Sequence, residues 1–166
     1  MCGRYVLKLG TSSQIAKQVL KQELKDFKEG DVYPGDKCLC IIRKNDGITL
    51  KILKWGLNDT KLINARLESI NQKITFKNLN KCIILASGYY EWKDKIRYEF
   101  DLNGDYLYLA GLYDDNNEMV IITKEADDKL KDIHDRMPVV LNQKEMLEYL
   151  LLNKINYSLK DLNITS

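Results

Sequence analysis

Residues 96–113 read IRYEFDLNGDYLYLAGLY, and this segment carries the strongest fold signal in the chain. Two apolar runs, residues 96–102 and 106–113, flank Asn103-Gly104. An Asn-Gly pair between two such runs is typical of a β-hairpin, because both residues tolerate the positive φ of a type I′ turn. The segment therefore predicts two strands that follow each other through a tight turn.

Further strands and helices are expected on both sides of this segment. Strands are predicted at residues 37–43, 48–55, 81–86 and 119–123, with Asn45-Asp46-Gly47 as the turn between the first two. Helices are predicted from a Ser12 or Ser13 cap to about residue 24, at residues 65–73 and 124–133, and from an Asn142 cap with Glu145 to about residue 152. Strands joined by short turns favour a single α+β domain over residues 1–166 with a largely antiparallel sheet.

The composition is that of an ordinary globular protein. The 166 residues are 45% hydrophobic and 30% charged, with a net charge of +2. This charge is too small to indicate nucleic-acid binding, so any DNA contact must come from a local patch. No signal peptide or membrane-spanning stretch is recognisable, which predicts a cytoplasmic protein without membrane contact. No glycine-rich phosphate loop occurs, so no nucleotide cofactor is expected.

The four cysteines are expected to be reduced in that compartment. They are Cys2, Cys38, Cys40 and Cys82. Cys38-Leu39-Cys40 lacks the spacing of a zinc knuckle, and the chain has a single histidine to complete a ligand set. Alternation along a strand explains this motif better, so no metal is expected.

Cys2 is the most distinctive chemical feature. A small second residue normally permits removal of Met1, which would leave an α-amine and a thiol on adjacent carbons. Near neutral pH, unperturbed groups of both kinds are partly nucleophilic. An N-terminal aminothiol captures an aldehyde by forming a Schiff base and then closing a thiazolidine ring. Taken alone, a cysteine at this position is more often a small buried hydrophobe.

Two further residues could carry proton transfer. His134 is the only histidine and lies at the end of a predicted helix, before a loop that ends at Pro138. Glu91 follows Tyr89-Tyr90 and precedes Trp92, and burial among aromatic rings would raise the pKa of its carboxyl group. A structural histidine and a solvated glutamate on an edge strand are the alternatives.

Other residues suit substrate contacts. The Asn64 amide could hold a sugar or a ring, and Arg66 could bind a phosphate. Tyr33-Pro34 predicts a turn whose ring could pack on a base. Trp55 could be a stacking platform or a core residue.

Taken in order, these motifs resemble the SOS-response-associated peptidase (SRAP) family of abasic-site processing proteins. The matching stretches are Met1–Tyr5, Tyr33–Gly35, Trp55-Gly56, residues 62–66 with Glu68, Phe76-Lys77, residues 88–93 and residues 132–138. Each motif is short, but together they span nearly the whole chain. The resemblance implies a bifurcated, mostly antiparallel and barrel-like open β-sheet surrounded by helices.

The resemblance also implies a function for individual residues. Cys2 would trap the aldehyde of an abasic site in single-stranded DNA as a thiazolidine. Asn64 would hydrogen-bond the sugar, Glu91 would act as general acid and base, and His134 would assist Schiff-base chemistry and reversal. Contacts to flanking DNA would come from Arg4, Tyr33, Pro34, Trp55 and Arg66. We expect a monomer with crosslinking, lyase-type and self-reversal activity.

The chain departs from the family pattern at three points. Residues 57–61 replace a longer loop rich in proline and tryptophan. Residues 30–32 lack the usual asparagine, and residues 74–75 lack an arginine often found nearby.

Two alternative functions remain at this level. One is a self-processing peptidase that cleaves its own Met1–Cys2 bond. The other is a non-enzymatic single-strand binding module, which would need none of Cys2, Asn64, Glu91 and His134.

Overall fold

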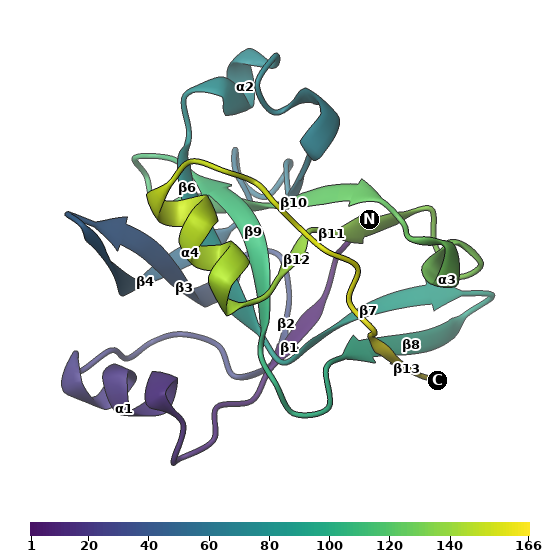
Figure 1. Ribbon diagram of the computed structural model, residues 1–166, viewed down its shortest axis with the longest axis horizontal. Helices are drawn as coiled ribbons and strands as arrows, with labels where there is room; N and C mark the ends of the chain where they lie inside the picture. Colours follow the sequence, from purple (N-terminus) through teal and green to yellow (C-terminus); the bar gives the residue numbers. More distant parts are fainter.

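The computed structural model of the protein describes residues 1–166, which form two β-sheets around a shared core. One sheet has five strands in the order β13-β8-β7-β1-β2. Their bounds are β1 (Tyr5–Leu7), β2 (Gly30–Val32), β7 (Gly88–Lys93), β8 (Ile96–Asp101) and β13 (Asn163–Thr165). All four pairings in this sheet are antiparallel, and β1 lies between β2 and β7 (Figure 1).

The second sheet has eight strands and partly closes into a ring. Its strands are β3 (Lys37–Lys44), β4 (Gly47–Trp55), β5 (Asn64–Arg66), β6 (Asn80–Ala86), β9 (Leu107–Tyr113), β10 (Glu118–Glu125), β11 (Arg136–Pro138) and β12 (Val140–Leu141). Their order is β11-β10-β4-β3-β6-β9-β12, and β10 also pairs with β5 and β9. Only the β10–β4 and β10–β5 pairs are parallel. The predicted α+β class and mostly antiparallel sheet are confirmed.

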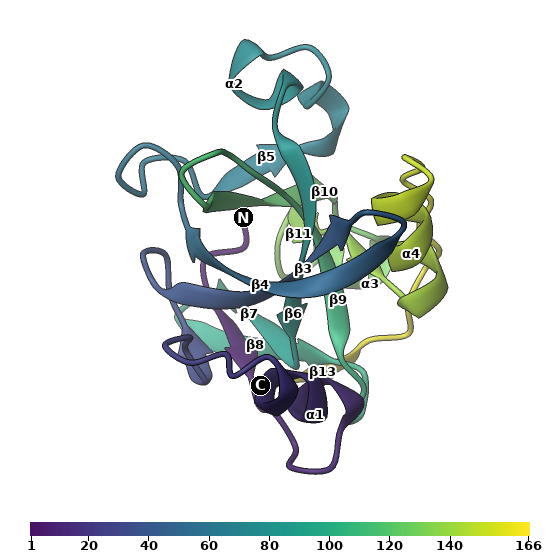
Figure 2. The ribbon, with the colours of Figure 1, turned by 90° about the vertical axis from the view of Figure 1, so that its left-hand side faces the viewer.

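The helices are short and lie around the sheets. They are α1 (Gln14–Lys21), α2 (Ile74–Lys77), α3 (Asp128–Lys131) and α4 (Gln143–Leu151), with a 3-10 turn at Leu67–Ser69. α1 and α2 lie at opposite ends of the molecule (Figures 1 and 2), and α4 packs on β6 and β9. None of the helices is both long enough and apolar enough to cross a membrane.

Capping explains where two helices begin. The Asn142 side chain accepts a hydrogen bond from the Glu145 amide at 2.8 Å, and the Glu145 carboxylate accepts one from the Asn142 amide at 2.9 Å. This reciprocal pair is the predicted capping box of α4. Ser13 caps α1 as predicted, but the helix ends at Lys21, before the expected residue 24. Glu23 has a φ of 53°, which an α-helix cannot contain.

The segment at residues 96–113 forms its turn but not a hairpin. Asn103 and Gly104 have positive φ angles, and a single bridge joins Leu102 to Asp105. The strands then separate, because β8 pairs with β7 and β13 while β9 pairs with β6, β10 and β12. The prediction that residues 96–102 and 106–113 pair as a hairpin is therefore wrong. The Asn-Gly turn instead connects the two sheets.

Two predicted helices are also shorter than expected, and each of the two segments begins as a strand. At residues 65–73, Asn64–Arg66 pairs in parallel with β10 before the 3-10 turn begins. At residues 124–133, Lys124 and Glu125 complete β10 by pairing with β11, and only α3 is helical. In both places strand pairing, of β5 with β10 and of β10 with β11, outweighs local helix propensity.

Gly111 allows the close approach of three strands in the ring. It pairs with Cys82 of β6 and with Ile121 of β10. A Cβ atom at this position would lie 2.4 Å from the Ile84 Cδ1 atom and 2.8 Å from the Val120 carbonyl oxygen. Its own carbonyl oxygen accepts a hydrogen bond of 2.7 Å from the Tyr149 hydroxyl. The ring therefore has no room for a side chain here.

We expect Gly111→Ala to lower the free energy of unfolding by about 1–3 kcal/mol, the usual cost of overpacking a core. Urea denaturation measures this change. Gly47→Ala is the matched control, because a Cβ there would meet nothing closer than the Lys44 carbonyl oxygen at 4.0 Å. Equal stability of the two variants would contradict this account of the ring.

Candidate functional site

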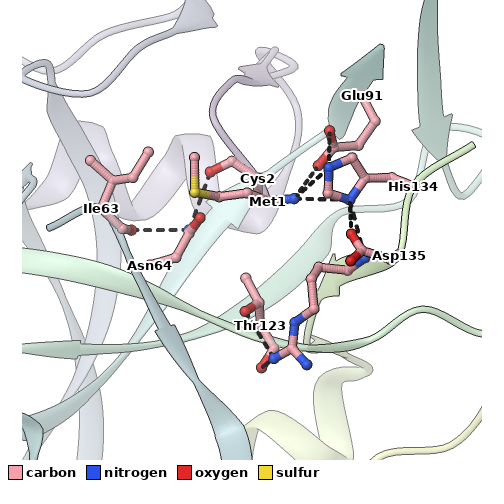
Figure 3. A network of polar contacts seen from close by, with 9 residues as sticks. Met1, Cys2, Ile63, Asn64, Glu91, Thr123, His134 and Asp135 are labelled. Carbon is pink, nitrogen blue, oxygen red and sulfur yellow. Dashed lines mark hydrogen bonds and ion pairs between the residues drawn. The ribbon is translucent and has the colours of Figure 1, made fainter. Parts of the chain in front are cut away.

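Four residues that are distant in the sequence meet where the two sheets face each other (Figures 2 and 3). Cys2 precedes β1 and Glu91 lies on β7, both in the five-stranded sheet. Asn64 begins β5, and His134 lies in the loop between α3 and β11. These are the four residues that the sequence predicted to be catalytic. We refer to Cys2, Asn64, Glu91 and His134 together as the N-terminal cluster.

The Met1 amine lies between Glu91 and His134 (Figure 3). It is 3.3 Å from the Glu91 Oε1 atom and 3.0 Å from each ring nitrogen of His134. The Met1 side chain is exposed, whereas the Glu91 side chain is only 7% exposed. The free end of the chain is thus held beside a buried carboxylate.

Glu91 is a central, buried residue. β7 lies between β1 and β8, so the alternative of a solvated glutamate on an edge strand is wrong. Burial raises the pKa of its carboxyl group, and the nearby Met1 amine and His134 partly oppose this rise. A raised pKa moves a carboxyl group towards the range in which it can both donate and accept a proton near neutral pH.

His134 has partners for two protonation states. The Arg136 amide lies 3.1 Å from the Nδ1 atom and suits a neutral ring, in which Nδ1 is an acceptor. The Asp135 carboxylate also lies 3.1 Å from Nδ1 and suits a charged ring, in which Nδ1 is a donor. The Nε2 atom is 3.9 Å from the Glu91 Oε2 atom. The Nδ1 atom therefore faces both a hydrogen-bond donor and a carboxylate.

Cys2 is fully buried, and its thiol differs from an unperturbed one. Burial and then the negative charge of Glu91 raise its pKa to about 12. The expectation of a partly ionised thiol near neutral pH is therefore wrong for this form of the chain. The sulfur is held as a neutral S–H group, so any reaction at it needs a base to remove the proton.

Asn64 ties the start of the chain to β5. Its Nδ2 atom donates to the carbonyl oxygens of Cys2 at 3.2 Å and Ile63 at 3.1 Å. Its Oδ1 atom is buried and has no hydrogen-bond partner. A buried acceptor without a donor is costly, so this oxygen is available for a hydroxyl or N–H group of a bound molecule.

Several predicted DNA contacts lie on the surface nearby. The Arg4 guanidinium lies 4.4 Å from the centre of the Tyr33 ring, and Tyr33 is 42% exposed. Pro34 is half-buried beside Tyr33. Arg66 is exposed on β5 and lines a polar hollow with Lys73 and other charged residues. Arg4 and Arg66 form no ion pair with a carboxylate.

Trp55 belongs to the core. Its side chain is fully buried, it packs on Tyr5 with ring centres 5.5 Å apart, and its Nε1 atom donates to the Ile63 carbonyl oxygen at 3.0 Å. No face of the indole is open to a base, so the prediction that Trp55 contacts DNA is wrong. The ring instead supports the backbone next to Asn64.

Two further residues, Asp135 and Arg136, support the site although no role was expected for them from the sequence. Arg136 donates to both carboxylate oxygens of Glu68 at 3.0 Å and to the Thr123 carbonyl oxygen at 2.9 Å, which fixes the loop behind His134. Asp135 contacts the histidine ring directly. Their position directly after the only histidine and shortly before Pro138 was the available signal.

No group of three or more histidine, cysteine, aspartate or glutamate side chains is arranged to hold a metal ion. The four cysteines are free and buried, and Cys38 and Cys40 lie in β3. The short segment at residues 57–61 closes on itself, with Leu57 and Leu62 exchanging backbone hydrogen bonds of 2.8 and 3.2 Å.

The chain is similar to known proteins in both sequence and fold. The model of the SOS response associated peptidase (SRAP) family matches residues 1–163. The chain is 32% identical to the abasic site processing protein YoqW of Bacillus subtilis, over 90% of this chain and 80% of the relative. It is 28% identical to the abasic site processing protein YedK of Escherichia coli, over 90% and 79% of the two chains. A crystal structure from Bordetella bronchiseptica superposes with a TM-score of 0.77 at 21% identity, covering 98% of both chains.

Replacing Glu91 should change how stability depends on pH. A carboxyl group whose pKa is higher in the folded than in the unfolded chain costs stability as the pH rises through this range. We therefore expect Glu91→Gln to gain stability relative to the unmodified chain between about pH 4 and pH 7. Urea denaturation at both pH values measures the difference.

Glu68→Gln is the matched control with the opposite sign. The hydrogen bond from Arg136 lowers the pKa of the Glu68 carboxyl group, so this variant should lose relative stability over the same pH interval. A Glu91→Gln variant that behaves like Glu68→Gln would contradict the assigned cost of burying Glu91.

Proposed function

Because this chain belongs to the SOS response associated peptidase family, we propose that it processes abasic sites in DNA by capturing them covalently on Cys2. The observation that carries the proposal is the meeting of Cys2, Asn64, Glu91 and His134 around the free end of the chain. The curated relatives named as abasic site processing proteins support the choice of substrate. We propose single-stranded DNA as the substrate, because the reactive group must reach the sugar directly.

The proposed reactive group is the Cys2 aminothiol after removal of Met1. The amine attacks C1′ of the ring-opened deoxyribose and expels water, which gives a Schiff base. The Cys2 sulfur then adds to the same carbon, its proton is removed, and the former imine nitrogen gains a proton. The product is a five-membered thiazolidine, and one water molecule is released overall.

The burial of Cys2 supports this order of steps. A thiol with a pKa of about 12 is almost entirely protonated at neutral pH, so the amine is the better first nucleophile. Glu91 then accepts the proton from sulfur when the ring closes. The raised pKa of this carboxyl group suits it to receive and return a proton, including during opening of the sugar ring.

His134 and Asn64 have supporting roles in the proposal. His134 can hold either charge state beside the terminal amine, so it assists formation of the Schiff base and its reversal. The unpartnered Oδ1 atom of Asn64 accepts a hydrogen bond from the sugar or the thiazolidine N–H group. Lyase-type chemistry and release of the adduct would both pass through the same Schiff base.

Contacts to the DNA strand would come from the surface beside the cluster. Arg4 and Arg66 carry positive charge that no carboxylate neutralises, and they would hold phosphates on the two sides of the captured sugar. The exposed Tyr33 ring and Pro34 would pack against a base.

Self-processing is the second candidate, and the position of Met1 favours it. The Met1 amine lies between Glu91 and His134, so the Met1–Cys2 bond is adjacent to a possible acid and base. Cys2 would then release its own N-terminus before it captures DNA. Removal by an ordinary aminopeptidase would give the same mature chain.

Crosslinking to abasic DNA tests the proposal. Single-stranded DNA with one uracil is treated with uracil glycosylase, incubated with the protein and separated on a denaturing gel. We expect a stable adduct with the unmodified chain and none with Cys2→Ala. Cys2→Ala and Cys2→Ser both keep the α-amine but lack the thiol, so each should give an adduct only when the Schiff base is reduced with borohydride.

Cys82→Ala is the matched control, because it removes an equally buried thiol that lies outside the cluster. A stable adduct with Cys2→Ala in the absence of borohydride would overturn the proposal. The second candidate, self-processing, is tested by measuring the intact masses of the same proteins and of Glu91→Gln. Met1 retained in Glu91→Gln and Cys2→Ala alone would support self-processing, and Met1 absent from all variants would exclude it.

A further inference from the structure

The strand that carries Glu91 has a second functional face. Successive residues of a strand point to opposite sides of a sheet. On β7, Tyr89 and Glu91 point to the core and the N-terminal cluster, whereas Tyr90 and Trp92 lie on the other face. Trp92 is 38% exposed, which is unusual for so large an apolar side chain.

Arginine and aromatic side chains alternate across this outer face. The Arg4 guanidinium lies 4.4 Å from the centre of the Tyr33 ring and 4.6 Å from that of Trp92. The rings of Trp92 and Tyr90 are 6.3 Å apart, and the Arg97 guanidinium lies 4.6 Å from the Tyr90 ring. We name this set the outer array, and its members are Tyr33, Arg4, Trp92, Tyr90 and Arg97.

The outer array crosses neighbouring strands and starts beside Cys2. It runs from the residue after β2, over the start of β1, to β7 and β8, which are adjacent in the five-stranded sheet (Figure 1). Only Gly3 separates Arg4 from Cys2. The outer array therefore begins two residues from the proposed reactive group.

The positive charges of the outer array are not used within the protein. Neither Arg4 nor Arg97 forms an ion pair or a side-chain hydrogen bond, and the Arg4 Nε atom is buried without a partner. The Arg136 guanidinium, in contrast, donates to both carboxylate oxygens of Glu68 and to the Thr123 carbonyl oxygen. The aromatic rings hold the two guanidinium groups in place and leave their N–H groups free for an anion.

Two acidic residues limit where an anion can bind. Asp31 accepts a hydrogen bond of 3.1 Å from the Tyr90 hydroxyl, and Glu99 lies opposite Tyr90 on β8. Both lie near the middle of the outer array. The surface thus offers two separate cationic positions, with the exposed Trp92 ring between them and the exposed Tyr33 ring beside Arg4, and not a uniform basic patch.

We propose that the outer array binds the single-stranded DNA that flanks the captured sugar, with Arg97 as a phosphate contact and Trp92 as a stacking platform. Alternating guanidinium groups and aromatic faces match the alternating phosphates and bases of a single strand. This inference rests on the proposed function and extends the contacts to residues on β7 and β8. It identifies a DNA path that begins at Arg4 and ends at Arg97.

The salt dependence of non-covalent binding tests this path. The probe is fluorescent single-stranded DNA with a tetrahydrofuran abasic analogue, which has no aldehyde and cannot be captured. Each phosphate contact to a single strand contributes about 0.7 to the slope of log K against log salt. We expect Arg97→Ala to lower the magnitude of this slope by about 0.7. Between 50 and 200 mM salt, the unmodified chain should then lose about 2.6-fold more affinity than the variant.

Lys93→Ala is the matched control. Lys93 is an exposed cation at the end of β7, and it points to the face opposite the outer array. Its removal should therefore leave the slope unchanged. Arg97→Lys keeps the charge and should restore the slope. An Arg97→Ala slope equal to that of the unmodified chain would overturn the outer array as a DNA path.

The two proposals can fail separately. If the unmodified chain forms the Cys2 adduct with true abasic DNA while Arg97→Ala keeps its slope, the outer array is wrong and capture stands. If Arg97→Ala lowers the slope but no adduct forms with the unmodified chain, capture is wrong and the outer array stands.

Discussion

The pairing of β1 with β7 is the interaction on which the site depends. Tyr5 pairs with Tyr89, and the Tyr90 amide donates to the Arg4 carbonyl oxygen at 3.0 Å. This pairing brings Cys2, three residues before Tyr5, beside Glu91, two residues after Tyr89. β1 has only three residues, so its position relies on pairing with β2 and β7 on both sides. A chain end held in this way avoids the fraying that is usual at termini.

The two faces of β7 carry residues with different proposed roles, catalysis on one side and DNA binding on the other. The inward side of β7 supplies a buried carboxylate with a raised pKa, and the outward side supplies rings that hold guanidinium groups at the surface. The other sheet completes the cluster through Asn64 and His134, both of which lie next to strands that pair with β10. Burial makes Cys2 a poor free nucleophile, and in the proposed mechanism the thiol therefore reacts only after the substrate has engaged the amine.

Local signals in the sequence predicted local structure well. The capping box at Asn142 and the strands on both sides of Asn45-Asp46-Gly47 depend on neighbouring residues, and the structure has them. The turn at Asn103-Gly104 was also correct, but the partners of its strands were not, because burial in two different sheets decides them. The short stretches around residues 65 and 124 look helical locally but are extended because distant strands pair with them, β10 in the first case and β11 in the second.

The residues of the cluster could be predicted from their chemical types and from their resemblance to family motifs. These residues are Cys2, Asn64, Glu91 and His134. Their burial could not be predicted from the sequence. The core position of Trp55 and the high pKa of Cys2 follow from packing that no local pattern reports. The central claim is that the N-terminal aminothiol reacts as a unit. After crosslinking, nuclease and trypsin digestion, mass spectrometry of the peptide covering residues 2–4 tests it directly. We expect this peptide to lack Met1 and to carry the deoxyribose remnant. When the digest is treated with an amine-labelling reagent and a thiol-alkylating reagent, neither should modify this peptide. A remnant on a lysine, or on a peptide that still begins with Met1, would contradict it.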